Sequence, residues 1–250
     1  MIKVKNVEID GKNPKICSSI VENRQEDILE MGEKLMMKKS VDIIEWRIDF
    51  YEECFDTKKV LETAALLRVI VNKKPILATF RTKKEGGEKS IEQAVYKELI
   101  ISLAISGYID MADVEVYFMD KAETKQLIDK LKKNVAVVGS YHDFDKTPSC
   151  SEIYERIEYM REVGADIPKI ACMPISEEDV FNLMKTTGDF AKRNKDAVVV
   201  AMSMGKMGKI SRMAGKSFGS AITFGCLGKA SAPGQINVDD LRNILDILND

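Results

Sequence analysis

The sequence predicts an α/β fold in which a (β/α)8 barrel follows a short N-terminal β-hairpin. Strands alternate with helices eight times along the chain, and such alternation implies a parallel sheet. Eight strand–helix units within 250 residues match the length of a closed barrel. A doubly wound open sheet is the alternative, because the number of strands does not prove closure. No linker-like or low-complexity segment interrupts the chain, so we expect residues 1–250 to form a single domain.

Strand-like and helix-like segments alternate from residue 15 onward. Before them, alternating apolar residues around Asp10-Gly11 predict a small hairpin within residues 1–14. The predicted strands are Lys15–Ile20, Ile43–Asp49, Pro75–Arg81, Met111–Val116, Val135–His142, Ile167–Met173, Ala197–Ser203 and Ala221–Leu227. The helices that follow them are Gln25–Lys38, Thr57–Asn72, Ser90–Ser106, Lys121–Lys133, Cys150–Val163, Glu177–Arg193, the short Ile210–Gly215 and Val238–Leu248.

Several predicted strands carry charged residues on one face. Side chains alternate between the faces of a strand, so Glu45, Arg47 and Asp49 lie opposite apolar neighbours. Asp113 and Glu115 follow the same pattern in the fourth strand. An antiparallel sheet with one solvated face would explain this, but the intervening helices make the sheet parallel. The mouth of a TIM barrel is then the natural place for the polar face, because active sites of such barrels lie at the C-terminal ends of the strands. The residues at or near such ends are Glu45, Arg47, Arg81, His142 and Lys169.

Lys169 lies in a short apolar stretch, Ala165–Pro174, that is bounded by two prolines. Both faces of this strand are apolar, since Ile170 and Cys172 oppose the face that carries the lysine, and we expect burial on both sides. A buried ammonium is unfavourable unless it is paired, and desolvation favours the neutral amine, which is a nucleophile. The residues alone leave two interpretations open, a reactive lysine or one that the fold merely tolerates.

His142 is the only histidine, and it ends the strand next to the one that carries Lys169. Imidazole titrates near neutral pH, so it can take up and return a proton. A lone histidine is more often structural, but its place in the predicted barrel mouth favours a catalytic role. Glu85 precedes a double glycine after the third strand, where its carboxylate can orient an imidazole or hold it protonated. The alternative for this stretch is a charged surface loop.

Two segments near the C-terminus are candidates for ligand binding. Arg212 follows the seventh strand and suits a two-pronged hydrogen bond to a carboxylate, although taken alone it is more typical of a surface arginine. Residues 228–235 combine glycine, proline and small residues after the last strand. They predict a mobile lid that excludes water and supplies Ser231 and Gln235, with an ordinary connection as the alternative.

Composition and missing motifs argue against several classes of protein. A net charge of −2 argues against a general nucleic-acid surface, and one histidine nearly excludes a multi-histidine metal site. No apolar run approaches the roughly 20 residues of a membrane helix. Ser217 fits the G-x-S-x-G pattern, but a helix precedes it and a strand follows, which is the reverse of the hydrolase arrangement. Five scattered cysteines and an N-terminus without a signal-peptide core lead us to expect reduced thiols and a cytoplasmic protein.

The order and spacing of a set of short motifs along the whole chain are distinctive. These motifs are Glu45–Asp49, Phe80-Arg81, Glu85–Glu88, His142–Phe144, Lys146–Pro148, Ala165–Ala171, Ile210–Arg212, Phe218–Ser220 and Ala230–Gln235. Together they resemble the type I 3-dehydroquinate dehydratase family of the shikimate pathway.

The resemblance implies dehydration of 3-dehydroquinate to 3-dehydroshikimate with syn stereochemistry, by a homodimer that uses neither a metal nor an organic cofactor. It implies that Lys169 forms an imine with the substrate ketone, which acidifies the neighbouring C–H. His142 then acts as the general acid and base, Glu85 sets its protonation, and Arg212 clamps the substrate carboxylate. The other residues that it places around the substrate are Ser19, Glu45, Arg47, Arg81, Met202, Phe224, Ser231, Ala232 and Gln235.

A class I Schiff-base aldolase acting on another small keto acid or sugar is the alternative activity, because it also uses a barrel lysine. A serine hydrolase acting through Ser217 and a non-catalytic binding barrel are the weaker alternatives. We expect a small-molecule substrate as the partner, and neither nucleic acid nor a membrane.

Overall fold

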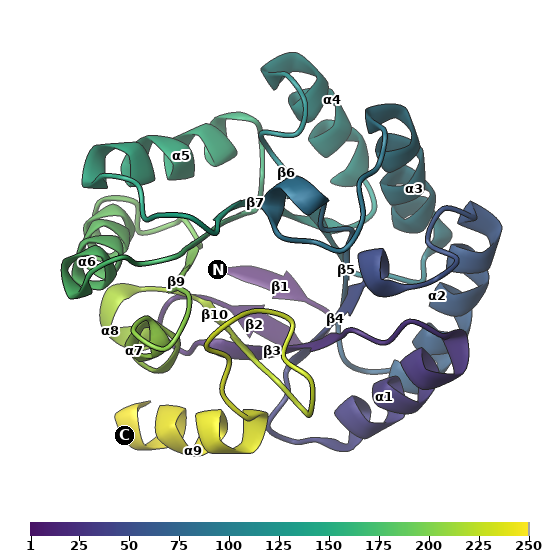
Figure 1. The fold of residues 1–250 in the computed structure, drawn as a ribbon, viewed down its shortest axis with the longest axis horizontal. Coiled ribbons are helices and arrows are strands. Elements are labelled where there is room, and N and C mark those ends of the chain that lie inside the picture. Colours follow the sequence, from purple (N-terminus) through teal and green to yellow (C-terminus); the bar gives the residue numbers. More distant parts are fainter. Residues whose placement is uncertain (250) are drawn as a thin grey trace.

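The computed structural model describes residues 1–249 and shows eight parallel strands curved into a nearly closed barrel, with helices around the outside (Figure 1). The strands of the barrel are β3 (Lys15–Ile20), β4 (Ile43–Arg47), β5 (Ile76–Thr79), β6 (Met111–Glu115), β7 (Ala136–Asp143), β8 (Ile167–Cys172), β9 (Val200–Ser203) and β10 (Ile222–Gly225). The helices are α1 (Gln25–Met37), α2 (Thr57–Val71), α3 (Gln93–Ser106), α4 (Lys121–Leu131), α5 (Cys150–Glu162), α6 (Glu177–Arg193), α7 (Lys209–Met213), α8 (Gly215–Phe218) and α9 (Val238–Asn249).

The barrel closes between β9 and β10. Val199 and Ser220 form a parallel bridge at this seam, and the N–H of Ala221 donates to the carbonyl oxygen of Val199 at 2.9 Å. Strands β10 and β3, which are farthest apart in the sequence, pair as a regular parallel ladder. The predicted barrel is therefore confirmed, and the open-sheet alternative is wrong.

Most predicted boundaries lie within three residues of the observed ones. Side-chain caps explain why some starts are well defined: Ser149 and Ser176 each accept the backbone N–H of the third helical residue and complete capping boxes at α5 and α6. Three short helical segments lie outside the prediction: α8 and the 3-10 turns η1 (Ile48–Phe50) and η2 (Lys83–Glu85).

The strand predicted to reach Asp49 ends at Arg47, and that expectation was wrong. The backbone turns into η1 at this point, which brings the Asp49 carboxylate beside the guanidinium of Arg47. Arg47 donates to both carboxylate oxygens, through Nε at 2.8 Å and Nη2 at 2.7 Å. The bidentate pair satisfies two buried charges, which a straight strand would leave further apart.

Side chains that point into the barrel change from apolar to polar along the strands. On β4, Ile43 lies in the apolar interior cluster, and Glu45 and Arg47 follow it on the same face. Trp46 points the other way and packs in the cluster between the sheet and the helices. Thus the charged faces lie inside one end of the barrel, as the sequence predicts.

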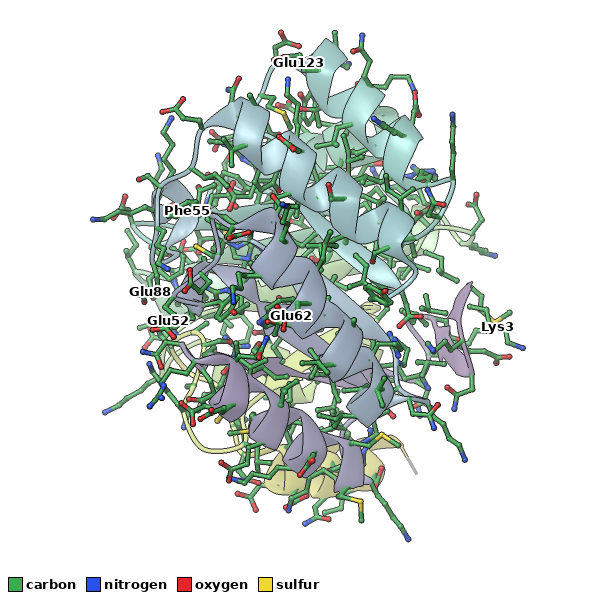
Figure 2. All side chains as sticks on the ribbon, turned by 90° about the vertical axis from the view of Figure 1, so that its right-hand side faces the viewer. Lys3, Glu52, Phe55, Glu62, Glu88 and Glu123 are labelled. Carbon is green, nitrogen blue, oxygen red and sulfur yellow. The ribbon has the colours of Figure 1, made fainter. Side chains whose placement is uncertain are left out.

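The N-terminal hairpin lies at the other end of the barrel. Its strands β1 (Ile2–Val4) and β2 (Val7–Ile9) are antiparallel, with Ile2 paired to Ile9. Figure 1 shows the hairpin in the middle of the ring, and Figure 2 shows Lys3 at the opposite end of the molecule from Glu52 and Glu88. Ile9 is fully buried in the apolar interior cluster, so the hairpin closes the N-terminal end and leaves the polar end for a ligand.

All five cysteines are free thiols. None of the helices in the described part of the chain is long and apolar enough to span a bilayer.

Replacing Ile9 with Ala is expected to lower the free energy of unfolding by about 2–4 kcal/mol, because it leaves a cavity where the hairpin meets the barrel. Ile105→Ala is the control, since Ile105 is 63% exposed and its truncation should change stability by at most about 0.5 kcal/mol. Urea denaturation followed by fluorescence measures both. Equal stabilities would mean that the hairpin is not part of the core.

Candidate active site

A partly enclosed pocket lies inside the C-terminal end of the barrel, under the loop that joins β10 to α9. The structure brings together every residue that the sequence singles out for the site, with Ser19 just outside the lining. The predicted residues in the lining are Glu45, Arg47, Arg81, Glu85, His142, Lys169, Met202, Arg212, Phe224, Ser231, Ala232 and Gln235. Four further residues complete it: Gly86, Phe144, Ala171 and Met204.

Lys169 lies in the middle of β8 and is only 4% exposed. Its amine nitrogen Nζ lies 3.4 Å from Oδ2 of Asp113 and 4.5 Å from the centroid of the Phe224 ring. The carboxylate balances the charge, and the ring face adds a cation–π contact. A separation of 3.4 Å is long for a charge-assisted hydrogen bond, so the amine is paired without being held tightly.

His142 occupies the same inner face as Lys169 on the neighbouring strand. The register pairs Ser140 of β7 with Lys169 of β8, so His142 is two residues further toward the mouth. Its ring nitrogen Nδ1 lies 2.8 Å from Oε2 of Glu85, and its backbone N–H donates to the same oxygen at 3.1 Å. With Nδ1 engaged, Nε2 is the nitrogen left for a ligand in the pocket.

Burial lowers the pKa of His142 well below its ordinary value, and the nearby cations Arg81, Lys169 and Arg47 lower it further. Burial also raises the pKa of Glu85, an effect to which the Glu115 carboxylate adds and which Arg81 opposes. The resting imidazole is therefore neutral at pH 7 and able to accept a proton. The contact between Oε2 of Glu85 and Nδ1 of His142 orients the ring.

The double glycine after β5 lets Glu85 reach the histidine. A Cβ atom at Gly87 would lie 1.9 Å from the carbonyl oxygen of Arg81, and one at Gly86 would lie 2.2 Å from the Phe144 ring. Gly86 also has a φ of +83°, in the left-handed region that favours glycine. These positions fold η2 back over the barrel, which buries Glu85, whereas Lys83, Lys84 and Glu88 of the same stretch stay exposed as a charged surface loop.

Arg81 links the charged residues of neighbouring strands. Its Nη2 donates to Oδ1 of Asp113 at 2.8 Å, and its Nη1 donates to Oε1 of Glu115 at 3.1 Å and to Oγ of Ser140 at 2.9 Å. A longer contact of 3.4 Å reaches Glu85. Because its donors are already engaged with protein groups, Arg81 mainly fixes the carboxylates around the pocket.

The sequence places Asp113 on an inward polar face without giving it a role in the site, and it does not single out Ser140. Both are fully buried, and Ser140 donates to Oδ1 of Asp113 at 2.6 Å. Burial would raise the pKa of Asp113, but Arg81 and Lys169 outweigh it and lower the pKa below the ordinary value. The alternation of Asp113 and Glu115 with apolar residues was the available signal, but it does not say which carboxylate faces the lysine.

Glu45 is buried without a cationic partner in hydrogen-bond contact within residues 1–249. It accepts hydrogen bonds from the hydroxyls of Ser19 and Thr79, the latter at 2.9 Å. Ser19 is in turn 3.0 Å from the hydroxyl of Ser231 in the loop above. Ser19 therefore connects the pocket floor to its cover.

The loop after β10 is folded down over the pocket. The carbonyl oxygen of Pro233 accepts from Nη2 of Arg212 at 3.0 Å and from the N–H of Gly205 at 3.2 Å. Gln235 and Ser231 bond each other, with Gln235 Oε1 accepting from the Ser231 N–H at 2.9 Å. The loop therefore covers the site rather than merely connecting two elements, and its mobility stays a prediction.

Arg212 is buried, which excludes the interpretation as a surface arginine. Its Nη1 donates to the carbonyl oxygen of Phe224 at 3.3 Å, whereas its Nε is buried and has no partner within the described chain. Burial lowers the pKa of Arg212 to about 10. A buried guanidinium with an unused donor and no carboxylate within salt-bridge distance, among residues 1–249, suits an anionic ligand.

The fold and the site together define a (β/α)8-barrel enzyme. Its pocket combines a buried amine, an imidazole–carboxylate pair and an arginine, Arg212, whose charge has no counter-ion among residues 1–249. No group of three or more histidine, cysteine or acidic residues is arranged to hold a metal ion anywhere in residues 1–249.

Comparison with known proteins identifies the family to which this barrel enzyme belongs. The family model for type I 3-dehydroquinase matches residues 16–250. A 3-dehydroquinate dehydratase of Listeria welshimeri is 45% identical over 251 residues, which span 99% of this chain and 98% of the relative. The crystal structure of a type I 3-dehydroquinate dehydratase from Clostridium difficile superposes with a TM-score of 0.95 at 41% identity, covering 99% of this chain and 97% of that one. A 3-dehydroquinate dehydratase from Geobacillus kaustophilus gives a TM-score of 0.94 at 38% identity, over 99% and 95% of the two chains. The chain belongs to the type I 3-dehydroquinase family and is a hydro-lyase.

His142 gives a single imidazole signal in NMR, because the chain has only one histidine. We expect its titration midpoint to lie below the ordinary value of about 6.5. Since the unfolded histidine takes up a proton at higher pH than the folded one, stability linked to His142 is complete above about pH 6.5 and is lost as the pH falls. The same protein unfolded in urea is the control and should titrate near 6.5. A folded midpoint at or above the unfolded one would contradict the neutral resting imidazole.

Proposed function

We propose that the protein dehydrates 3-dehydroquinate to 3-dehydroshikimate by syn elimination through a Schiff base on Lys169, with His142 as the general acid and base. The observation that carries the proposal is the shared pocket: the amine of Lys169 and the imidazole of His142 point inward from adjacent strands and line one pocket. The family's hydro-lyase activity and the names of the relatives supply the substrate.

In the first proposed step, the amine of Lys169 attacks the ketone carbon and forms a C–N bond. The ketone oxygen leaves as water with two of the three protons of the lysine ammonium, and an iminium that keeps the third proton remains. The iminium withdraws electrons from the neighbouring carbon, so that its C–H becomes acidic. A related structure, the C. difficile enzyme with covalent modified comenic acid, supports covalent chemistry in this family.

In the second proposed step, Nε2 of His142 removes the acidic proton and gives an enamine. The enamine expels the hydroxyl group, and the imidazolium returns its proton to that leaving oxygen, which departs as water. One residue in both roles requires that the proton and the hydroxyl leave from the same face. Hydrolysis of the remaining imine releases the product and restores Lys169.

The substrate carboxylate is proposed to bind Arg212, whose buried Nε lacks a partner within the described chain. Glu45, Arg47, Ser231 and Gln235 are the proposed partners of the ring hydroxyls, and Arg81 acts beside them by fixing the acidic residues. The residues proposed to shape the pocket are Ser19, Met202, Phe224 and Ala232.

The family resemblance also supports a cytoplasmic homodimer. Light scattering on the purified protein tests the oligomeric part of this proposal, and a particle of 28.1 kDa would contradict it.

Replacing Lys169 with Ala should lower kcat/KM for 3-dehydroquinate by at least about 10⁴-fold, because the nucleophile is lost. Formation of the conjugated enone, measured by ultraviolet absorbance, reports turnover. Sodium borohydride with substrate should add one reduced adduct to the wild-type protein, at Lys169. Lys185→Ala is the control, since Lys185 lies on the surface in a salt bridge with Asp189 and should leave both readouts unchanged. An adduct at another lysine would remove Lys169 from its role, and release of two carbon fragments would favour the aldolase.

Replacing His142 with Ala should reduce turnover by about 10²- to 10⁴-fold while the protein still forms a borohydride-reducible adduct. The imine needs only the amine and the ketone, whereas proton removal needs the imidazole. Mass spectrometry of the reduced protein measures the adduct, and enone absorbance measures turnover. Turnover at the wild-type rate would reject the proton-transfer role of His142.

A further inference from the structure

We propose that Asp113 is a positioning residue for the reaction, which holds the Lys169 amine and serves as the counter-ion of the iminium formed on it. The inference rests on the proposed Schiff-base function and deepens it. It comes from the contact between Oδ2 of Asp113 and Nζ of Lys169, which lie 3.4 Å apart at a position where both side chains are almost fully buried.

The two oxygens of Asp113 have different surroundings. Oδ1 accepts hydrogen bonds from Nη2 of Arg81 at 2.8 Å and from Oγ of Ser140 at 2.6 Å. Oδ2 faces Lys169. The first oxygen therefore fixes the orientation of the carboxylate, and the second presents a negative charge to the amine.

The other carboxylates at the mouth of the barrel form hydrogen bonds to groups other than Lys169. Glu85 contacts the backbone and ring of His142, and Glu115 accepts from the N–H and the hydroxyl of Thr82, both at 2.7 Å. Glu45 accepts from two hydroxyls, those of Ser19 and Thr79. Within residues 1–249, Asp113 is the only carboxylate in salt-bridge contact with Lys169.

A fixed carboxylate beside Nζ of Lys169 matches the positive charge that this nitrogen carries during imine formation. A lysine ammonium and a ketone give an iminium and one water, so three N–H protons become one N–H and two protons of water. The single positive charge on nitrogen is conserved. A carboxylate that faces this nitrogen stabilises the cation before and after the C–N bond forms, and burial strengthens the attraction because little water screens it.

The length of the contact also matters, because the next step removes the positive charge. When His142 takes the C–H proton, the iminium becomes a neutral enamine and the cation moves to the imidazole. A counter-ion bound too tightly would favour the iminium and oppose this transfer. At 3.4 Å, Asp113 is close enough to stabilise the iminium and is not locked onto the nitrogen.

The test compares Asp113→Asn with Glu115→Gln in the full-length protein. Both variants remove a buried carboxylate that contacts Arg81 from the same strand, but only Asp113 contacts Lys169. The readout is the rate at which 3-dehydroquinate becomes trapped on Lys169 by borohydride, measured by rapid quench and mass spectrometry. Calorimetric binding of a substrate analogue that has an alcohol in place of the ketone measures the intact pocket, because this analogue cannot form an imine.

We expect Asp113→Asn to slow trapping by about 10- to 100-fold, with analogue affinity within about threefold of wild type; tenfold corresponds to about 1.4 kcal/mol. Glu115→Gln should slow trapping at least tenfold less than Asp113→Asn. A merely structural role would weaken analogue binding and trapping together in both variants. Equal trapping rates in Asp113→Asn and wild type would overturn the proposal.

If Asp113→Asn fails to bind the analogue, a second variant, Asp113→Glu, tests the proposal instead. It keeps the charge but moves the carboxylate by one C–C bond, so slower trapping at unchanged analogue affinity supports the proposal and wild-type trapping overturns it. A wild-type protein that turns over substrate without any trapped adduct would overturn the Schiff-base function and the role of Asp113 together. Trapping in wild type with no change in either Asp113 variant would overturn the role of Asp113 alone.

Discussion

The ion pair between Arg81 and Asp113 is the interaction on which the rest of the site depends. Arg81 extends from the end of β5 to groups on β6, β7 and η2, and thereby holds Asp113, Glu115 and Ser140 in one arrangement. A buried charge without a partner is far less stable than a paired one, so loss of this guanidinium would leave several carboxylates uncompensated. The surroundings of the Lys169 amine depend on this cluster, because Arg81 orients the carboxylate of Asp113 that faces the amine.

Strand geometry separates the part of the barrel that gives stability from the part that carries chemistry. The inward side chains are apolar near the hairpin, where Ile9 and Ile43 are fully buried, and polar toward the opposite mouth. Because the side-chain period of a strand is two, a residue such as Glu45 shares a face with Ile43 but lies closer to the ligand. Substitutions near the hairpin therefore act on folding, and those near the mouth act on the site.

The sequence predicted what depends on local pattern. Alternation identified the barrel and the inward faces, and the position of Lys169 and His142 on adjacent strands followed from chain order. What it missed depends on contacts between distant segments. Asp113 is 56 residues from Lys169 in the chain, and only the curvature of the closed sheet brings their side chains together across β7. The 3-10 turn at Glu85 was missed for a related reason, because the double glycine permits a turn without specifying which one.

The two proposed reactive groups, Lys169 and His142, lie on strands, whereas much of the cover of the pocket lies on the loop after β10. Lys169 and His142 need a fixed separation, and neighbouring strands of a ladder provide it. A ligand must still enter a pocket that the loop partly covers, so the cover has to be separable from the reactive groups. Arg212 connects the cover to the pocket. Its Nη2 donates a hydrogen bond to the carbonyl oxygen of Pro233 in the loop, while its Nε has no partner within the described chain. An anion bound at Nε would add negative charge beside a guanidinium that already holds the loop. Closure of the pocket and recognition of the carboxylate would then depend on the same side chain.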